Sequence, residues 1–396
     1  MSSNSNTSPL TNRARYIAGP DSDQVSVQAS ATAQGLGEVM LLRRRGITFG
    51  WIAAASKQNN NEPRNTMRSA WSRSAPCVLP GHCTAAIPNY VNEITQSQQL
   101  MERIAAGESP ADLLEEEHYS QRLQPRFEML AATSDEGDQQ EIETIEFDVM
   151  DGDEIIGENL WSKCSWLSYE DDDVSLRFRF SFGIAGYEDV AADPERQGYA
   201  GELTEAIFPE SAIISSDKKL ARQLCEVLNI RQLAYVERII YFNAPNGGAQ
   251  FHQDVERGHL GVVFAQLRGR TGWVTCSKSD LMDEVQTFVA NKQNYTALQQ
   301  LLPDASSVKE LIAIAADRSQ LNLGLDDSDN EALEWLINRC PSFHQQLSDH
   351  GHTYILNPGD IILLPQTNIN ECCWHSVFCL DDFAGEALSF AIRDTN

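Results

Sequence analysis

The feature that most constrains this fold is a strict alternation of apolar and polar residues near the middle of the chain. The apolar members are Val174, Leu176, Phe178, Phe180 and Phe182, and the polar ones between them are Ser175, Arg177, Arg179 and Ser181. Successive side chains of a β-strand point to opposite faces, so this period of two predicts a strand with one apolar face. Strand-like texture continues from about residue 143 onward, and the fold class expected is mainly β with α.

The segments that follow predict a sheet interrupted by helices. A helix is expected over 218–228, and strands over 236–242, 252–254, 260–267, 272–276, 353–356, 360–364, 375–380 and 386–393. Between them, Ser307-x-x-Glu310 and Ser328-x-x-Glu331 match the capping-box pattern that starts helices. The architecture predicted is a double-stranded β-helix, or cupin-like jelly roll, with a helical insertion at about 279–348.

The N-terminal third differs in composition from the rest. Residues 1–35 are polar and rich in small residues, and we expect them to be disordered. Residues 36–142 are expected to form an arm, marked by Arg43-Arg44-Arg45, and a helical region over 94–131 that packs on the core. The remainder, 143–396, is the predicted jelly-roll domain. A chain of 396 residues is long enough for a sizeable core.

Charge and cysteine content limit which binding partners and which cellular compartment we expect. The net charge is −27, and a surface this negative repels phosphate, so neither nucleic acid nor an anionic membrane is an expected partner. A cationic substrate or a basic peptide is favoured as a partner, and solubility or a salty habitat is an equally open explanation of the acidity. No apolar run reaches the roughly 18 residues that span a bilayer. The nine cysteines show no paired CxxC spacing, which predicts free thiols and a cytoplasmic location.

One triplet carries metal chemistry. His252-Gln253-Asp254 follows a Gly-rich turn in an extended stretch, so its His and Asp project to the same face. Far downstream, a Pro-Gly-Asp turn at 358–360 starts a strand that ends in Leu-Leu-Pro, and His375 opens the next strand. Two imidazoles and one carboxylate form the facial set that holds non-haem Fe(II) with open positions. His252, Asp254 and His375 are therefore the predicted metal ligands and catalytic residues.

These motifs resemble a known family. Phe264-Ala265-Gln266-Leu267-Arg268-Gly269 downstream of His252-x-Asp254, followed by Pro358-Gly359-Asp360, Pro365 and Trp374-His375, resembles the JmjC-type cupin oxygenases, especially their protein-hydroxylase branch. The resemblance covers roughly 235–276 and 353–393. It implies Fe(II), O2 and 2-oxoglutarate as cofactor and cosubstrates, iron ligation by the triad above, and hydroxylation of an unactivated C–H bond.

The cosubstrate pocket departs from the family pattern. Many relatives place a Lys four residues beyond the position of Leu267, where this chain has Thr271, and a hydroxyl residue where it has Ala249. A buried carboxylate still needs a cationic partner. Arg393 on the last strand is the first candidate, with Arg268 and Arg270 in reserve. Further pocket contacts are expected from the side chains of His259, Tyr241 and Asn243.

The function predicted is hydroxylation of a side chain in a peptide or protein, or of an amino-acid-like metabolite. The insert is expected to cover the barrel mouth as a substrate lid or as the surface of a homodimer. Two other function classes stay open. The missing Lys favours a metal cupin that works without 2-oxoglutarate, as a lyase, isomerase or direct dioxygenase. A non-catalytic ligand-binding cupin is the third.

Overall fold

The computed structural model describes residues 16–18, 25–26, 39–45, 47–53, 66–135, 137–168, 173–183, 193–256, 258–327 and 329–395. Two short strands, β1 (Tyr16–Ala18) and β2 (Val25–Ser26), belong to this part of the chain. The rest of the segment 1–35, predicted to be disordered, lies outside the described residues. Among the described residues, no helix combines the length and apolar character needed to cross a bilayer.

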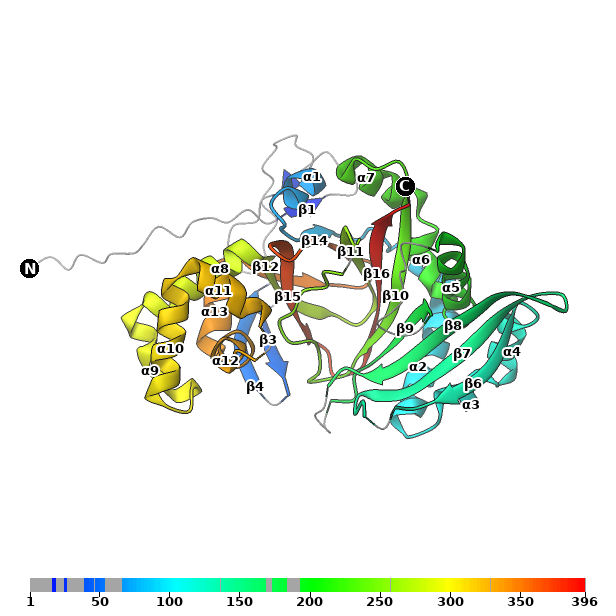
Figure 1. Cartoon of the computed structure of the whole chain (residues 1–396), viewed down its shortest axis with the longest axis horizontal. Helices are drawn as coiled ribbons and strands as arrows, with labels where there is room; N and C mark the ends of the chain where they lie inside the picture. Colours follow the sequence, from blue (N-terminus) through cyan, green and yellow to red (C-terminus); the bar gives the residue numbers. More distant parts are fainter. Residues whose placement is uncertain are drawn as a thin grey trace, which may run out of the picture.

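A large antiparallel sheet forms the centre of the molecule (Figure 1). Besides β1 and β2, of which β1 pairs with β5 in parallel, its strands are β5 (Cys77–Leu79), β6 (Phe127–Thr133), β7 (Glu141–Asp151), β8 (Glu154–Trp166), β9 (Leu176–Phe182), β10 (Leu233–Asn243), β11 (Gly261–Arg268), β12 (Thr271–Ser277), β13 (Thr353–Leu356), β14 (Ile361–Asn368), β15 (Glu371–Cys379) and β16 (Gly385–Asp394). The order across the sheet is β13-β12-β15-β14-β11-β16-β10-β9-β8-β7-β6. The class observed is mixed α and β, with a large antiparallel sheet and more helix than the predicted class, mainly β with α, implies.

The sheet encloses an apolar interior. Inward side chains of β11, β14 and β16 form one buried cluster with those of β12, β13 and β15, so the two groups of strands face each other. Val262, Phe264, Trp273, Leu364 and Val377 belong to this cluster. The interior lies between the β10 side of the sheet and the strands nearest the helical insert, as Figure 1 shows.

Helices cover the outer face of the sheet. They are α1 (Thr66–Trp71), α2 (Val91–Ala105), α3 (Pro110–Leu114), α4 (Glu117–Leu123), α5 (Pro194–Ile207), α6 (Ala212–Ser215) and α7 (Lys218–Leu228), with short 3-10 turns at Ile87–Tyr90 and Pro209–Ser211. The apolar face of β9 packs against them, and Phe178 and Phe180 contact Phe208 with ring centroids 5.1 Å and 6.0 Å apart. The alternation is confirmed over Leu176–Phe180, where Arg177 and Arg179 occupy the opposite, half-buried face. It is wrong at its start, because Val174 and Ser175 precede the strand, and there Val174 is exposed while Ser175 is buried.

The predicted helical stretch 94–131 needs one correction. Helix is observed over three segments that end at Leu123, and β6 begins at Phe127. In β6, Phe127 is buried while the end of the strand is exposed. The pairing of this edge strand with β7, in the register Phe127↔Val149, supplies the strand hydrogen bonds. Tertiary pairing therefore overrides the local helical pattern over the last five residues.

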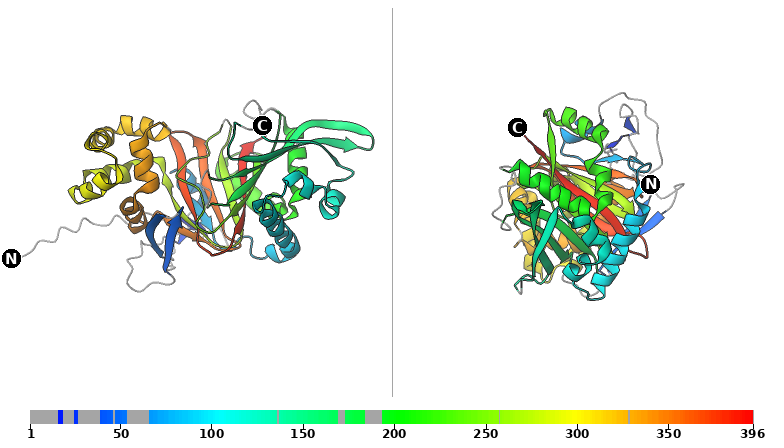
Figure 2. Two further views of the ribbon diagram at one scale, coloured as in Figure 1. Left: turned by 90° about the horizontal axis from the view of Figure 1, so that it is seen from below. Right: turned by 90° about the vertical axis from the view of Figure 1, so that its right-hand side faces the viewer.

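The insertion forms a separate helical layer. It consists of α8 (Lys278–Ala290), a 3-10 turn (Lys292–Asn294), α9 (Tyr295–Leu301), α10 (Ala305–Ala316), α11 (Arg318–Asp326), α12 (Glu331–Arg339) and α13 (Pro341–Asp349). Figure 2 shows that it lies at the opposite end of the molecule from the long β6–β8 strands. The predicted cap at Ser307 is wrong. The carboxylate of Asp304 accepts from the backbone N–H groups of Ser306 and Ser307, so the helix begins earlier. Ser328 lies outside the described residues.

The N-terminal arm is a β-hairpin. Its strands are β3 (Val39–Arg44) and β4 (Ile47–Ala53). Leu42 and Phe49 are buried in one apolar cluster with the insert and with Phe251 and Phe378 of the sheet region. The hairpin thus fills the angle between the helical layer and the strands.

Candidate metal centre

Two segments 123 residues apart form the centre. His375 lies in β15, and the backbone of His252 pairs with it as an isolated antiparallel bridge. The N–H of His252 donates to the carbonyl of His375 at 3.0 Å, and the N–H of His375 donates to the carbonyl of His252 at 2.9 Å. This double exchange places the two imidazoles side by side, with ring centroids 4.1 Å apart.

Asp254 completes the set. Its Oδ1 lies 3.5 Å from Nε2 of His252, and its Oδ2 lies 3.6 Å from Nε2 of His375. One ligand atom from each of the three residues lies within 4.8 Å of the others. Within the part of the chain that the structure describes, this is the one group of three such side chains that meets this criterion. The predicted triad is thus brought together.

The hydrogen bonding of His252 and the burial of His375 favour the binding of a metal cation. Nδ1 of His252 lies 2.7 Å from the carbonyl of Gln250, so this nitrogen carries the proton and Nε2 keeps its lone pair toward Asp254. Burial, together with the nearby His252, lowers the pKa of His375 to about 3, so its ring is neutral near pH 7. A neutral imidazole is the form that ligates metal. Two imidazoles and one carboxylate on one side fit a divalent iron with open positions.

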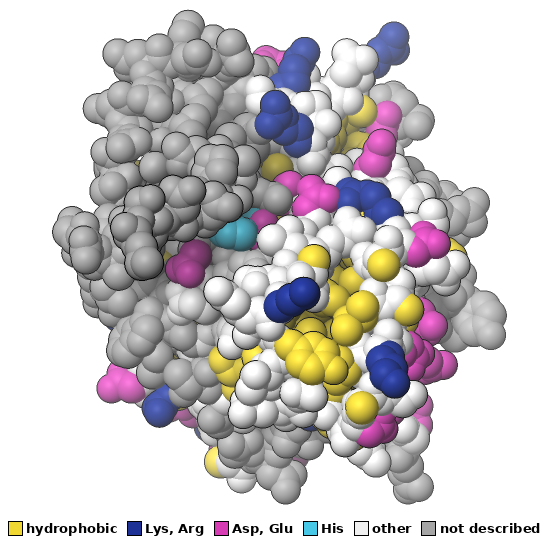
Figure 3. Space-filling model, turned by 90° about the vertical axis from the view of Figure 1, so that its left-hand side faces the viewer, with side chains coloured by type: hydrophobic (Ala, Val, Ile, Leu, Met, Phe, Trp, Pro, Cys, Tyr) yellow, Lys and Arg dark blue, Asp and Glu magenta, His cyan; other side chains and the backbone are white. Residues whose placement is uncertain are grey.

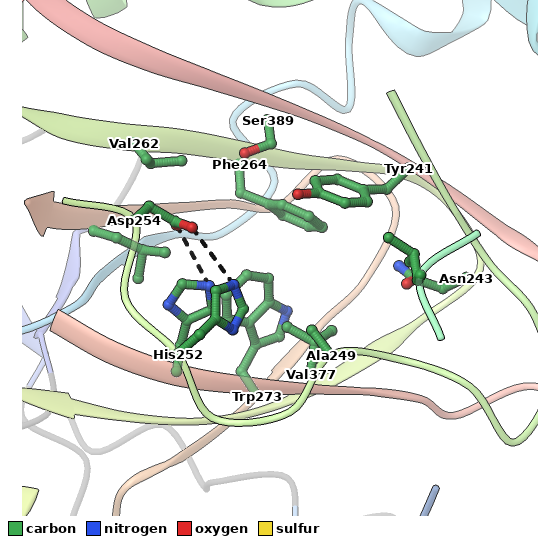
Figure 4. Close-up of a pocket in the computed structure, with 13 residues that line it drawn as sticks. Tyr241, Asn243, Ala249, His252, Asp254, Val262, Phe264, Trp273, Val377 and Ser389 are labelled. Atoms are coloured by element: carbon green, nitrogen blue, oxygen red, sulfur yellow. Dashed lines mark ion pairs between the residues drawn. The ribbon is translucent and has the colours of Figure 1, made fainter. Parts of the chain in front are cut away.

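A cavity opens on the triad (Figure 4). Its enclosed volume is about 30 Å³, and the wider space that includes open solvent at its mouth is about 410 Å³. The side chains that line it are mostly apolar: Leu167, Ala249, Val262, Phe264, Trp273, Leu364 and Val377, with Tyr241, Asn243, Ser389 and the three triad residues as polar members. The hydroxyls of Tyr241 and Ser389 lie across the cavity from the His and Asp side chains in Figure 4. Such an apolar space with a few convergent polar groups is typical of a small-molecule site.

The predicted pocket contacts divide into two groups. Tyr241 and Asn243 line the cavity. Thr271, His259 and Arg393 are not among its lining residues. Thr271 Oγ1 instead donates to Gln266 Oε1 at 2.8 Å and accepts from the Trp273 indole N–H at 3.0 Å.

His259 and Arg393 lie next to each other beside the cavity. Burial and the charge of Arg393 lower the pKa of His259. The Arg393 guanidinium lies close to Gly258. A Cβ atom added to Gly258 would be 3.3 Å from Nη1 of Arg393. Arg393 points to the same face of β16 as Ser389 and lies four residues further along the strand.

The reserve arginines have other partners. Arg270 donates to both carboxylate oxygens of Asp381, through its backbone N–H at 2.6 Å and its guanidinium at 2.6 Å and 3.0 Å. The Arg268 guanidinium lies over the ring of Phe383, 5.1 Å from its centroid. Among the described residues that line the cavity there is no Lys or Arg.

One guanidinium lies beside Tyr241, which lines the cavity. Arg177 is its direct cross-strand partner in the pairing of β9 with β10, so the two side chains share one face of the sheet. Nε of Arg177 donates to the Ser165 hydroxyl at 3.2 Å. Burial raises the pKa of Tyr241, and Arg177 opposes this rise by its charge and by a side-chain hydrogen bond.

Several lining residues were missed at the level of sequence. Val377 has the same parity as His375 on one strand, so the sequence could have shown it. Which face Val262, Phe264 and Trp273 occupy relative to His375 depends on the register between strands. Leu167 carries no comparable signal, because it follows β8 in a bend. The adjacent Cys372 and Cys373 are buried, and burial raises the pKa of Cys372 to about 11, so they act as small apolar side chains.

Comparison with known proteins finds likeness in structure alone. No family model matches the sequence, and no curated protein matches it. The matching structures include an oxidoreductase of the 2OG-Fe(II) oxygenase family from Burkholderia pseudomallei, with 9% identity and a TM-score of 0.31, covering 84% of this chain and 92% of that chain. The ribosomal oxygenase YcfD from Escherichia coli has 13% identity and a TM-score of 0.23, covering 73% of this chain and 44% of that chain.

A further structure of YcfD, in complex with cobalt and 2-oxoglutarate, has 15% identity and a TM-score of 0.22, covering 73% of this chain and 45% of that chain. The match thus spans less than half of the YcfD chain. Both of these proteins are oxygenases.

Proposed function

We propose that this protein is an Fe(II)- and 2-oxoglutarate-dependent oxygenase that hydroxylates an unactivated C–H bond. The observation that carries the proposal is the His252–Asp254–His375 cluster, whose ligand atoms lie within 4.8 Å of one another at the floor of an apolar cavity. When bound, iron and 2-oxoglutarate supply the oxidant, as O2 and 2-oxoglutarate become succinate, CO2 and one oxygen atom inserted into the substrate C–H bond.

The strand arrangement supports a double-stranded β-helix. β10, β16, β11 and β14 are hydrogen-bonded neighbours, and β13, β12, β15 and the His252 segment are the strands across the interior. A metal centre on the second group would face the cavity between them. The chain's own contribution is to hold three ligands, exclude water with apolar walls and orient the substrate, which is a positioning task.

The polar end of the cavity suits the distal carboxylate of 2-oxoglutarate. The Tyr241 and Ser389 hydroxyls can donate to it, and the positive charge would come from Arg177 beside Tyr241. Arg177 has no carboxylate within ion-pair distance among the described residues, whereas Arg179 is paired with Glu237 at 2.6 Å. A charge-assisted contact of this kind contributes about 1.5–3 kcal/mol. We therefore place Arg177 ahead of Arg393 as the anchor.

The substrate we propose is a peptide side chain or an amino-acid-like metabolite with positive charge. The net charge of −27 favours a cationic substrate over nucleic acid or an anionic membrane. The insert would serve as a lid or as the surface of a homodimer. Large apolar side chains of the insert are exposed at Tyr295, Ile312 and Leu323. Figure 3, viewed from this end, shows apolar side chains gathered among charged ones. A cytoplasmic location remains part of the proposal.

The test is turnover of 2-oxoglutarate by protein reconstituted with Fe(II) without oxygen. We expect a weak visible charge-transfer band on adding 2-oxoglutarate, and succinate once O2 enters. Asp254→Ala should abolish both. If the wild-type protein binds iron but shows neither band nor succinate, this function is wrong.

That outcome would favour a second candidate, a metal enzyme that works without 2-oxoglutarate. The observation in its favour is that no Lys or Arg is among the described residues that line the cavity. Its substrate would then bind the metal directly, with no dicarboxylate beside it. Metal affinity without 2-oxoglutarate affinity distinguishes the two candidates.

A further inference from the structure

The segment that carries His252 contains one extra residue relative to its partner strand. Along β15 the hydrogen-bonded rungs advance by two residues each time. On the metal-binding segment they advance by two and then by three. The rungs are Cys379 N–H to Gly247 C=O at 3.2 Å, Val377 N–H to Ala249 C=O at 2.9 Å, and His375 N–H to His252 C=O at 2.9 Å. The extra residue makes a β-bulge over 250–251, a device that re-aims side chains beside active sites.

The bulge decides which side chain faces His375. Without it, the period of two would turn Phe251 toward the cavity and His252 away from it. With it, Phe251 is buried in the apolar cluster on the other face, and His252 lines the cavity. The bulge also turns the Gln250 carbonyl to Nδ1 of His252. Metal binding therefore depends on a local backbone irregularity.

Two residues from outside the sheet hold this irregularity. The backbone N–H of Phe251, which has left the ladder, donates to Oδ1 of Asn338 in α12 at 2.6 Å. Before the bulge, Nη1 of Arg44 donates to the Ala249 carbonyl at 2.5 Å and to the Ser376 hydroxyl at 2.5 Å. Arg44 thus links Ala249, three residues before His252, to Ser376, which directly follows His375.

The surroundings of Arg44 suit this role. Its side chain is 2% exposed, and the guanidinium lies 5.3 Å and 4.7 Å from the ring centroids of Phe49 and Phe378. Nη2 donates to the Asn338 carbonyl at 3.4 Å. Burial lowers the pKa of Arg44 to about 9, so it stays charged near pH 7. Among the described residues no carboxylate forms an ion pair with it, and its donors go to oxygens around the bulge.

We propose that Arg44 and Asn338 are positioning residues of the metal centre, which hold the bulge that turns His252 toward His375. This inference rests on the proposed metal-binding function. Arg44 comes from the N-terminal hairpin and Asn338 from the helical insert. The centre is therefore complete only when both segments are docked on the sheet.

The experiment measures Co(II) affinity and the visible Co(II) spectrum of the full chain for Asn338→Leu, Asn338→Asp, Arg44→Met and Arg44→Lys. Leu has a similar size but cannot accept from Phe251, whereas Asp can. Met fills the Arg44 site without donors. We expect Asn338→Leu and Arg44→Met to weaken Co(II) binding about tenfold or more. The Asn338→Asp variant should bind Co(II) as tightly as the wild type, and the Arg44→Lys variant should have an intermediate affinity.

Thermal unfolding of the metal-free proteins separates positioning from stability. A purely structural role would lower the melting temperature and leave the Co(II) affinity and spectrum of the folded protein unchanged, which would overturn the inference. If Asn338→Leu does not fold, Asn338→Ala replaces it and is judged by the same affinity. Arg43→Met, on the exposed face of the same hairpin, is the control and should bind Co(II) normally. A wild-type protein that binds no Co(II) would instead defeat the proposed function.

Discussion

The indole of Trp273 is stacked on the imidazole of His375, with ring centroids 5.3 Å apart and an angle of 24° between the planes. The two residues lie on neighbouring strands, where Trp273 pairs with Val377 and Thr275 with His375. The stacked indole fills one side of the ring and keeps water from it. The buried ring then points its Nε2 toward Asp254 and the cavity.

Removing one ligand should abolish metal binding. His375→Ala and Asp254→Ala each leave two ligands, which is too few to hold Fe(II) against water. We expect Co(II) or Fe(II) affinity to fall at least about a hundredfold, measured by titration of the metal-free protein. His118→Ala, at a histidine on α4 outside the cavity, is the matched control and should bind metal normally. Equal metal content in all three variants would contradict the assignment.

Arg177→Met should weaken 2-oxoglutarate binding without loss of metal. The loss of a charge-assisted contact of about 1.5–3 kcal/mol corresponds to a ten- to hundredfold rise in Kd, read from the charge-transfer band or by calorimetry. Arg179→Met, two residues along the same face but paired with Glu237, should leave that Kd close to the wild-type value. If only Arg393→Met raises it, the anchor lies at the other arginine.

Filling the cavity should abolish 2-oxoglutarate binding and leave metal binding unchanged. Ser389 lines the cavity opposite the triad, and Leu at this position would occupy the space near Tyr241. We expect Ser389→Leu to keep Co(II) affinity and to lose 2-oxoglutarate binding. Ser389→Ala, which removes only the hydroxyl, should raise the Kd of 2-oxoglutarate by less than about tenfold. Tight 2-oxoglutarate binding by the Leu variant would place the cosubstrate elsewhere.

Gly248 should tolerate no side chain. Its φ is +128°, and a Cβ there would lie 2.1 Å from the carbonyl oxygen of Val377. Gly248→Ala combines backbone strain with a clash against β15, and we expect it to lower the free energy of unfolding by more than about 2 kcal/mol. Gly107→Ala is matched, because its φ is +97° but nothing lies within 4 Å of the added Cβ. Denaturant unfolding should show the smaller loss there.

Stability should fall as pH rises because of a buried pair of carboxyl groups. Glu210 and Glu386 are fully buried, and Glu386 accepts from Ser97 and from the Gln98 amide at 3.1 Å. Burial first, and then the charge of Glu386, raises the pKa of Glu210 well above its usual range. The folded state therefore keeps a proton that the unfolded chain releases above about pH 4.3.

The free energy of unfolding should therefore decrease as pH rises. The contribution of Glu210 is fully favourable below the unfolded pKa and is lost, by about 1.4 kcal/mol per pH unit, as pH rises toward the folded pKa. Glu210→Gln removes the titration, so we expect a flatter dependence of unfolding free energy on pH between 5 and 8. The exposed Glu117→Gln should keep the wild-type slope. Parallel curves for the wild type and Glu210→Gln would contradict the pairing.

The sequence by itself determined most of the strands and identified the three residues of the triad. Alternation over 176–180 and the shared parity of His252 and Asp254 are local properties of an extended chain, so they can be read without coordinates. That His252 faces His375 depends instead on the bulge at 250–251. The same holds for the helical character of the insert. The cap at Ser307 and the end of the helical stretch near residue 131 could not be read in this way, because Asp304 and the pairing with β7 compete with the local pattern.

Only the tertiary structure decided how the centre is held and which cation lies near the cavity. Arg44 reaches Ala249 and Ser376 across 205 and 332 residues of chain, and Asn338 reaches Phe251 across 87. Such contacts carry no periodic signal, because hydrogen bonds between segments distant in sequence depend on packing and not on local conformation. Arg177 likewise gains its position beside Tyr241 from the register of β9 against β10, which no single strand encodes.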